Sequence, residues 1–314
     1  MEFHSFSAQF APAIIDLWNR NVDPAFPMTK ALFQQNTVDD GNILREGTAV
    51  VVDKGQVIAV VVSKIIKDAK KVPMQMDKGW IHLLLVDKAY RSQGIGTQLL
   101  QKAEHALQQA GMIKIQIGGD LLHYFCGIPE HDQTTQQFLV KHGYEPGQVM
   151  TDLTHTLKEQ VELPTFEEIH FEPLAFEEKE AFLTFMHHAF PGRWEYEAIV
   201  YFEKGGTGKE FVVAKKGNDI IGFCRMNDVT GPTIAQNMNW STAFEGNFGG
   251  IGPLGIESSA RKGGYGLGIT KAAVHFLQKR GVETILIDWT TIIEFYAKLG
   301  FTPWQNYHMY SKAL

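Results

Sequence analysis

Two segments of the sequence place an arginine three residues before a pair of glycines, in the pattern R-x-x-G-x-G. The first is RSQGIG, from Arg91 to Gly96, and the second is RKGGYG, from Arg261 to Gly266. Each follows an apolar run and precedes an amphipathic helical pattern. The first N–H groups of a helix lack partners within the helix and, with the helix dipole, can bind an anion. Glycines let the backbone approach a diphosphate closely, so the two segments predict phosphate-binding turns.

A single strand-to-helix turn of this kind can also be a tight connection without a ligand. Two copies in the same context favour a binding site. The spacing differs from two common phosphate loops. A dinucleotide fingerprint needs a third glycine, but Gly94 and Gly96 are followed by Thr97, Gln98 and Leu99. A P-loop needs Gly-Lys-Ser or Gly-Lys-Thr, which neither copy has.

The pattern resembles the acyl-CoA-binding motif R/Q-x-x-G-x-G/A of the GNAT N-acetyltransferase superfamily. The resemblance extends to the strands before the motif and the helices after it. It also includes FYAKLGF, from Phe295 to Phe301, which is similar to the closing motif of that superfamily. About two thirds of each half is covered. The resemblance implies a mixed α/β fold, built here as two tandem GNAT-like acyltransferase units, with acetyl-CoA as co-substrate.

The same resemblance implies which residues hold the coenzyme. Backbone groups beside the turn would pair with the pantetheine arm, and backbone amides of the turn would hold the pyrophosphate, leaving the thioester at a splayed gap in the sheet. The implied residues are Leu84, Val86, Arg91, Ser92, Gln93, Gly94, Ile95 and Gly96 in the first half, and Leu254, Ile256, Arg261, Lys262, Gly263, Gly264, Tyr265 and Gly266 in the second.

The two halves differ at the position of the general acid. Tyr296 lies four residues before Gly300, where GNAT enzymes commonly place a tyrosine that returns a proton to the leaving thiolate, whereas the first half has Leu139. Catalysis is therefore expected in the C-terminal half, with Tyr296 as the catalytic residue. Thirteen extra residues in the first half include Tyr124 and His131, which could substitute for the tyrosine or belong to a lid.

The general base is not assigned by the sequence. The strand position where some members of the superfamily keep a glutamate holds Trp80 in the first half and Gly250 in the second. Glu257 and Asp288 lie near the carboxyl ends of predicted strands, where active sites of α/β sheets collect. Either could orient a cationic acceptor, and both are also ordinary residues at the start of a loop.

The spacing of the repeat predicts the domain organisation. The arginine and glycines of the two turns differ by 170 positions, and Gly111 and Gly281, which end the following helices, keep that offset. From His142 and Leu299 onward the offset is 157, because of the extra residues in the first half. The chain is therefore predicted to be a tandem duplication with domains at 1–157 and 158–314.

Composition excludes several other functions. The 314 residues have a formal net charge of −6 and no basic tract, so nucleic acid is not an expected partner. The apolar runs are far shorter than the roughly 20 residues that span a bilayer. The N-terminus lacks the basic flank of a secretory signal, so a cytoplasmic location is the default expectation. Cys126 and Cys224 lack metal-ligand spacing and are expected to be buried thiols, with no metal site.

The function predicted from these features is acyl-CoA-dependent N-acyl transfer to a small-molecule or peptide amine, most simply from acetyl-CoA. A non-catalytic acyl-CoA-binding or regulatory protein is the alternative, which Leu139 supports for the first half and Tyr296 opposes for the second. A nucleotide or phosphate binder of another fold is disfavoured by the missing third glycine. The acceptor, the acyl chain length and the oligomeric state are left open.

Overall fold

The computed structural model describes residues 1–314, which form two compact units. The first unit contains residues 1–68, 75–150 and 306–314, and the second contains residues 69–74 and 151–305. The ends of the two sequence halves are therefore exchanged relative to the predicted boundary at residue 157. Residues 151–157 belong to the second unit, and the last nine residues of the chain, 306–314, belong to the first.

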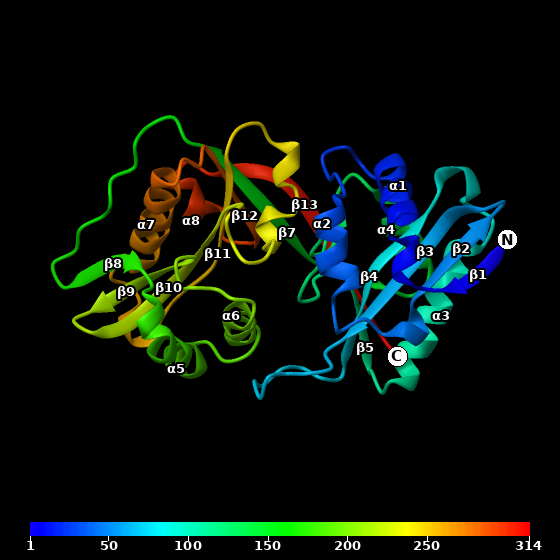
Figure 1. Ribbon diagram of the computed structural model, residues 1–314, viewed down its shortest axis with the longest axis horizontal. Coiled ribbons are helices and arrows are strands. Elements are labelled where there is room, and N and C mark those ends of the chain that lie inside the picture. Colours follow the sequence, from blue (N-terminus) through cyan, green and yellow to red (C-terminus); the bar gives the residue numbers. More distant parts are fainter. The chain divides into compact units, whose positions relative to one another are not determined.

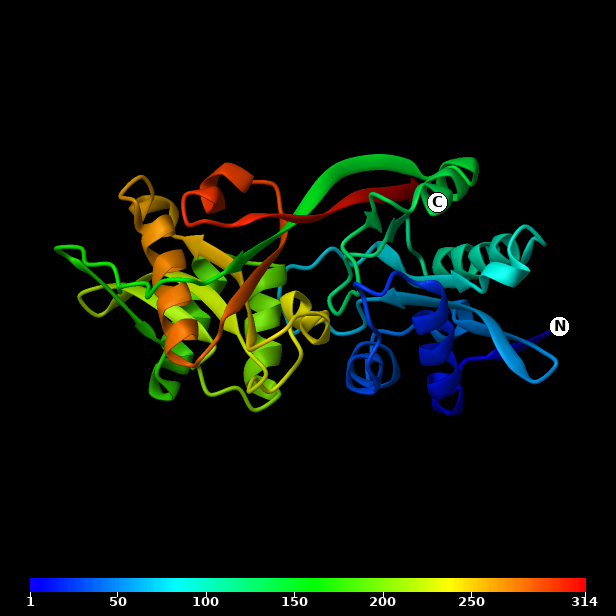
Figure 2. The same ribbon diagram turned by 90° about the horizontal axis from the view of Figure 1, so that it is seen from above.

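The first unit is a mixed sheet between two layers of helices, in the strand order β1-β2-β3-β4-β5-β13 (Figure 1). Helices α1 and α2 lie on one face and α3 and α4 on the other, as Figure 2 shows. Its elements are β1 (Glu2–Ser5), α1 (Ala11–Asn21), α2 (Lys30–Phe33), β2 (Ala49–Asp53), β3 (Gln56–Ile65), β4 (Lys78–Val86), α3 (Ile95–Gln109), β5 (Lys114–Ile117), β6 (Ile128–Pro129), α4 (Gln133–Lys141) and the start of β7 (Glu145–Thr156).

The second unit repeats this plan in the order β7-β12-β11-β10-β9-β8. Here α5 and α6 cover one face and α7 and α8 the other (Figure 2). Its elements are β8 (Ile169–Pro173), α5 (Lys179–Ala189), α6 (Arg193–Glu203), β9 (Phe211–Lys216), β10 (Asp219–Asn227), β11 (Phe248–Ile256), α7 (Tyr265–Lys279), β12 (Thr284–Thr290), α8 (Ile293–Ala297), the end of β7 and the start of β13 (Thr302–Ala313), whose remaining residues belong to the first unit.

One parallel strand pair in each unit stops pairing part-way along its length. Strands β4 and β5 pair from Lys78 with Lys114 to Ile81 with Ile117, and β11 and β12 pair from Phe248 with Thr284 to Ile251 with Ile287. In both units the register of the longer strand with its other neighbour shifts directly after this point, which marks a bulge. We call the unpaired space beyond the last parallel pair the strand gap.

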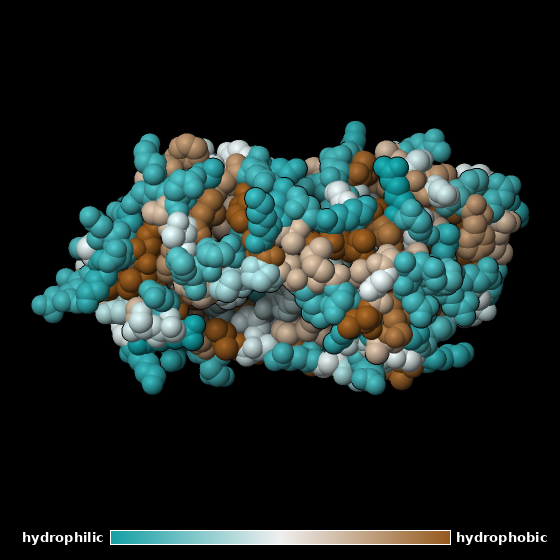
Figure 3. Space-filling view, turned by 90° about the horizontal axis from the view of Figure 1, so that it is seen from below, coloured by the Kyte–Doolittle hydropathy of each residue, from teal (hydrophilic) through white to brown (hydrophobic).

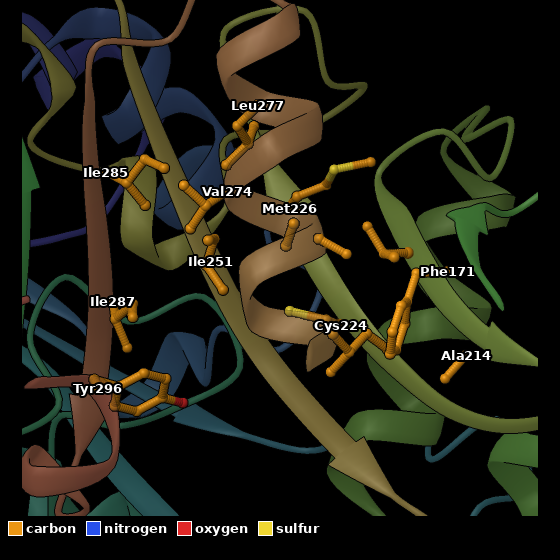
Figure 4. Packing of buried hydrophobic residues seen from close by; sticks show 14 of the residues in the cluster. Phe171, Ala214, Cys224, Met226, Ile251, Val274, Leu277, Ile285, Ile287 and Tyr296 are labelled. Atoms are coloured by element: carbon orange, nitrogen blue, oxygen red, sulfur yellow. The ribbon is translucent and has the colours of Figure 1, made fainter. Parts of the chain in front are cut away.

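Each unit has its own apolar core, centred on the helix that follows the glycine turn. The predicted apolar stripe of α3 is confirmed, because Leu99, Leu100, Ala103 and Leu107 are all fully buried. Figure 4 shows the corresponding core of the second unit, where α7 packs on the sheet beside Ile251 and Ile287. Burying a large apolar side chain contributes about 1.5–3 kcal/mol, so these two helices fix the turns that precede them.

The remaining surface and thiol features agree with a globular chain. Cys126 and Cys224 are free and buried, as predicted. Hydrophilic residues cover most of the face seen in Figure 3, and apolar residues appear on that face in separate patches. None of the helices combines the length and apolar character needed to cross a lipid bilayer.

Candidate active site

The two glycine turns have the same backbone geometry. Gly94 and Gly264 precede the first residue of α3 and α7 with φ values of 81° and 78°. Both are left-handed, a conformation that glycine adopts without steric cost. Neither helix start has a side-chain cap, so its first N–H groups are free of capping bonds from the side chain before them. The turn that the sequence predicted to hold phosphate is therefore present twice with one conformation.

The arginine of each motif bonds back to the strand before the turn. The Arg91 Nε group donates to the Val86 carbonyl at 3.1 Å, and Arg261 Nε donates to the Ile256 carbonyl at the same distance. In this structure each arginine therefore makes a bond that ties the turn to the strand before it. The predicted pantetheine-pairing residues Leu84 and Leu254 lie on β4 and β11 beyond the last parallel pair, at the strand gap.

In the first unit, charged and polar side chains fill the space beside the strand gap. The Lys64 ammonium lies 2.9 Å from a carboxylate oxygen of Asp40 and 2.9 Å from one of Asp120, and the other Asp120 oxygen lies 2.9 Å from His82 Nδ1. We call these four residues the first-unit cluster. All four are buried, and His82 occupies the residue directly after the last parallel pair.

The charges of the first-unit cluster stabilise one another. Burial opposes ionisation of Asp120, but the Lys64 ammonium and the neighbouring His82 hold the pKa of this carboxyl well below its usual range. Burial, with the Lys64 charge acting in the same direction, lowers the pKa of the His82 imidazole, so the ring is neutral at neutral pH. Because its charges are paired with one another and buried, the first-unit cluster leaves no position for an acceptor amine.

The extra segment of the first half packs over the same region. Tyr124 is buried, its hydroxyl shares a hydrogen bond with Thr37 at 2.7 Å, and its ring centre lies 4.4 Å from that of His82. Phe125 stacks on Trp18 of α1. Of the two side chains proposed from the sequence, Tyr124 belongs to this packed layer. By contrast, His131 is 48% exposed.

The second unit has small or neutral residues at the corresponding positions. Gly252 corresponds to His82 by the offset of 170, and Asn227, which pairs with Gly250, corresponds to Lys64, which pairs with Trp80. A Cβ atom at Gly252 would have Asp288 Oδ1 as its nearest neighbour, 3.8 Å away. On this side of the strand gap the second unit therefore has Asp288 and Asn237 in place of the charge-paired first-unit cluster.

A carboxylate lies at this position. Asp288 directly follows the last parallel residue of β12. Desolvation raises the pKa of its carboxyl to about 6, and the nearby Glu197 carboxylate acts in the same direction, against the opposite effects of Arg193 and of a hydrogen bond from Asn237. A carboxyl with a pKa near 6 is largely ionised at neutral pH and is still basic enough to accept a proton.

Asn237 connects three strands beside Asp288. Its side-chain oxygen accepts a hydrogen bond from Asn227 Nδ2 at 3.0 Å, its Nδ2 group lies 3.4 Å from the Gly252 carbonyl oxygen, and it also bonds to Asp288. A Cβ atom at Gly250 would lie 2.2 Å from the Asn237 oxygen. Gly250, at the position where some GNAT enzymes keep a glutamate, is therefore glycine because Asn237 occupies that space.

Helix α6 supplies the charged side chains that face the end of β12. Arg193 Nε lies 2.7 Å from Glu197 Oε1, and the Arg193 guanidinium lies 4.8 Å from the ring centre of Trp289. Arg225 of β10 is buried, which lowers the pKa of its guanidinium, and the charges of Glu197 and Asp288 act in the opposite direction. The carboxylates of Glu197 and Asp288 therefore interact with the guanidinium groups of Arg193 and Arg225.

Tyr296 approaches the strand gap from the opposite helical layer. Its side chain packs in the same cluster as Ile251 and Ile287, the last parallel pair, and Figure 4 shows it directly beside Ile287. Burial raises the pKa of its hydroxyl above the ordinary value, and the Cys224 and Asp288 side chains add to this effect. Tyr296 therefore stays protonated at neutral pH. Leu139 of the first unit is a fully buried core residue.

Comparison with known proteins identifies the family. The model of the acetyltransferase (GNAT) family matches residues 13–121 and 176–301, which together are more than half of the chain. The chain belongs to the GNAT acetyltransferase family. The two matches fall in the two sequence halves and confirm the predicted pair of GNAT units. No curated protein matches at the sequence level.

Solved structures resemble this GNAT chain over nearly its whole length. One is the GCN5-related glucosamine N-acetyltransferase region of a fungal multidomain GH3 β-N-acetylglucosaminidase, with a TM-score of 0.89 and 21% identity. It covers 99% of this chain and 38% of the fungal one. A GCN5-related N-acetyltransferase from Sphaerobacter thermophilus has a TM-score of 0.74 and 17% identity, over 99% of this chain and 95% of its own.

A tandem GNAT protein from the clavulanic acid biosynthesis pathway has a TM-score of 0.70 and 14% identity, over 99% of this chain and 98% of its own. At these identities the likeness establishes the fold. The tandem GNAT architecture that the repeat predicted is therefore confirmed.

Sequence reasoning found some of the side chains at the GNAT strand gap and missed others. Tyr296 and Asp288 were both singled out, the latter only as a residue that could orient an acceptor. Asn237, Glu197 and Arg193 carry no recognisable spacing, because they come from a loop and a helix far from β12 in sequence. In the sequence, the position of Asp288 directly after an apolar strand is the feature that could have indicated a candidate general base.

Proposed function

We propose that the second unit transfers an acetyl group from acetyl-CoA to a primary amine, with Asp288 as the general base and Tyr296 as the general acid. The observation that carries this proposal is the placement of a carboxylate of raised pKa and a protonated tyrosine at one strand gap, close enough for the carboxylate charge to raise the tyrosine pKa. The corresponding gap of the first unit holds the first-unit cluster instead.

The proposed steps assign one proton transfer to each residue. Asp288 accepts a proton from the incoming ammonium, directly or through one water, so that the free amine can attack the thioester carbonyl. The carbon–nitrogen bond forms, the carbon–sulfur bond breaks, and Tyr296 donates its proton to the leaving thiolate. Backbone N–H groups of β11 beyond the last parallel pair are available to polarise the carbonyl. Both residues return to their starting states through solvent.

For the acceptor we propose a small amine on a polyhydroxylated carrier, with an amino sugar such as glucosamine as the first candidate. Asn237 and Glu197 offer amide and carboxylate groups to hydroxyls and to an ammonium, and the Trp289 ring lies beside them. The fungal structure that resembles this chain is named a glucosamine N-acetyltransferase region, and this name supports the choice of an amino sugar as the first candidate. A peptide amine is the competing acceptor.

For the first unit we propose binding of acetyl-CoA without acetyl transfer. It retains the glycine turn with its arginine bond, but Leu139 replaces the acid and the first-unit cluster fills the acceptor side. Calorimetric titration with acetyl-CoA should therefore find two sites per chain. A single site that is lost on changing Gly264 to a bulky residue would contradict this assignment.

The catalytic proposal is tested by release of free thiol from acetyl-CoA with a panel of amines that includes glucosamine, short peptides and polyamines. Asp288→Asn and Tyr296→Phe should each lower kcat by about 10²–10⁴, the usual effect of losing general acid–base catalysis, while acetyl-CoA binding stays close to the parent. Tyr310→Phe, which removes a buried hydroxyl in the first unit, is the matched control and should keep the parental rate. Parental turnover by Tyr296→Phe would refute the assigned acid.

A further inference from the structure

Strand β12 ends in an unusual backbone turn directly after Asp288. Trp289 has a φ of 49°, in the left-handed region that bulky residues avoid because Cβ crowds the following carbonyl oxygen. Pairing between β12 and β7 also shifts register between Ile287 and Thr290. A strained residue of this kind persists only where its surroundings hold it, and such residues collect at functional sites. The turn at Trp289 sets the direction in which the Asp288 side chain leaves the strand.

The Asp152 carboxylate holds this turn. Its Oδ1 atom accepts a hydrogen bond from the Trp289 backbone N–H at 2.8 Å. Asp152 is 5% exposed, so the bond lies away from bulk water, where a hydrogen bond is electrostatically stronger than it is in water. The Trp289 side chain also has a partner, because the Arg193 guanidinium lies over its ring. The residue after Asp288 is therefore fixed at both its backbone and its ring.

Asp152 comes from the first half of the sequence. It lies on β7, before the predicted repeat boundary, yet β7 pairs with β12 through Leu153 and Ile287 in the second unit. The residue of the second half at the same repeat position, 157 further on, is Met309. Methionine has no carboxylate to bind a backbone N–H group, so the exchanged strand brings this bond to the second unit alone.

We propose that Asp152 is a positioning residue for acetyl transfer in the second unit, because its bond to Trp289 fixes the turn that directs the Asp288 carboxylate into the strand gap. The inference rests on the proposed role of Asp288 as general base. It implies that the second unit's site is completed by a strand that the first half of the sequence supplies. Asp152 itself does not contact the reacting atoms.

Loss of this bond should also change the pH dependence of the reaction. The titratable and charged groups that face Asp288 are Glu197 and Arg193 on α6, Arg225 on β10 and Tyr296 on α8. Desolvation is the largest reason for the raised pKa of Asp288. If the turn relaxes and the carboxylate reaches water, its pKa falls toward the usual value, so the acid limb of kcat/KM moves to lower pH.

The test compares variants of the full chain with acetyl-CoA and the best amine of the panel. Asp152→Ala should lower kcat by about 10- to 100-fold, as expected for misplacement of a catalytic group by about an ångström, and shift the acid limb downward, with KM for acetyl-CoA unchanged. Asp152→Asn keeps an oxygen acceptor in place and should retain most of the rate. Asp152→Glu keeps the carboxyl group but moves it by one methylene, so it should also lose rate. This variant takes the place of Asp152→Ala in the test if the Ala variant does not fold.

The decisive experiment repeats the Asp152→Ala substitution in a Trp289→Gly variant. Glycine adopts positive φ freely, so Asp152→Ala should cost less than about threefold in that background if Asp152 acts by holding the turn. A folded Asp152→Ala or Asp152→Glu variant with parental kcat and pH profile would overturn the inference, as would an equal loss in the glycine background. A parent protein that transfers acetyl to no amine would overturn the proposed function, and the inference with it.

Discussion

Replacing Glu197 by Gln tests the electrostatic environment of Asp288, the proposed general base. Desolvation is the largest cause of the pKa of about 6 at the Asp288 carboxyl, and the Glu197 carboxylate raises this pKa further, whereas Arg193 lowers it. Glu197→Gln removes the repulsion and leaves Arg193 without its carboxylate partner. Both changes favour ionised Asp288, so the sign is unambiguous, and its pKa should fall, by a shift on the order of one unit.

The magnitude follows from the fraction of Asp288 that is ionised. At pH 5 a carboxyl with a pKa of about 6 is about one tenth ionised, and one with a pKa of about 5 is about half ionised. Relative to its own plateau, the variant should therefore be about fivefold more active than the parent at pH 5. The assay is kcat/KM for the amine between pH 4.5 and 8, in which ionisation of the amine is common to both proteins and cancels in their ratio.

The matched control for this prediction is Glu203→Gln. Glu203 lies on the same helix and is about half exposed, and its partner is Lys70 rather than Arg193. Its removal changes the net charge by the same amount without changing the surroundings of Asp288. An acid limb that stays at the parental pH in Glu197→Gln, or moves upward, would refute the reasoning. An equal shift in Glu203→Gln would show a non-specific charge effect.

Two further predictions concern packing beside the strand gaps. Lys64→Met leaves Asp40 and Asp120 buried without their counter-charge and should lower the free energy of unfolding by about 3–5 kcal/mol, as measured by urea unfolding, whereas amine acetylation at a permissive temperature should keep its kcat. Gly250→Ala would bring Cβ to 2.2 Å from the Asn237 oxygen, so it should cost about 1–3 kcal/mol by overpacking. Displacement of Asn237 should also lower kcat, and unchanged stability would contradict the clash.

The sequence predicted those features whose causes are local or repeat along the chain. The two glycine turns, the amphipathic helices after them and the domain-sized repeat are each visible in a short window or in a constant offset. The structure has these turns and helices, and the family match confirms the tandem GNAT units. The assignment of coenzyme A to the turns and of proton transfer to Tyr296 stays a prediction that the proposed experiments address.

Which side chains face the two strand gaps depends on contacts between distant segments, and no local sequence pattern predicts these contacts. The carboxylate that we propose as the base lies on β12. The position where some GNAT enzymes keep a glutamate lies on β11 and is a glycine, because Asn237 fills its space. Tyr124 was visible in the extra segment, but only its packing against His82 shows that the segment fills the first unit's gap.

The sequence by itself determined the fold class, the duplication and the two turns, because helix periodicity, strand runs and glycine conformations are properties of neighbouring residues. The tertiary structure alone decided which side chains face each strand gap. Asp288, Glu197 and Asn237 meet through strand pairing and helix packing between distant segments. The exchange of β7 and β13 ends between the units places Asp152 beside Trp289, 137 residues later in the chain. Contacts between segments that far apart are fixed by the packed fold and leave no periodic trace in the sequence.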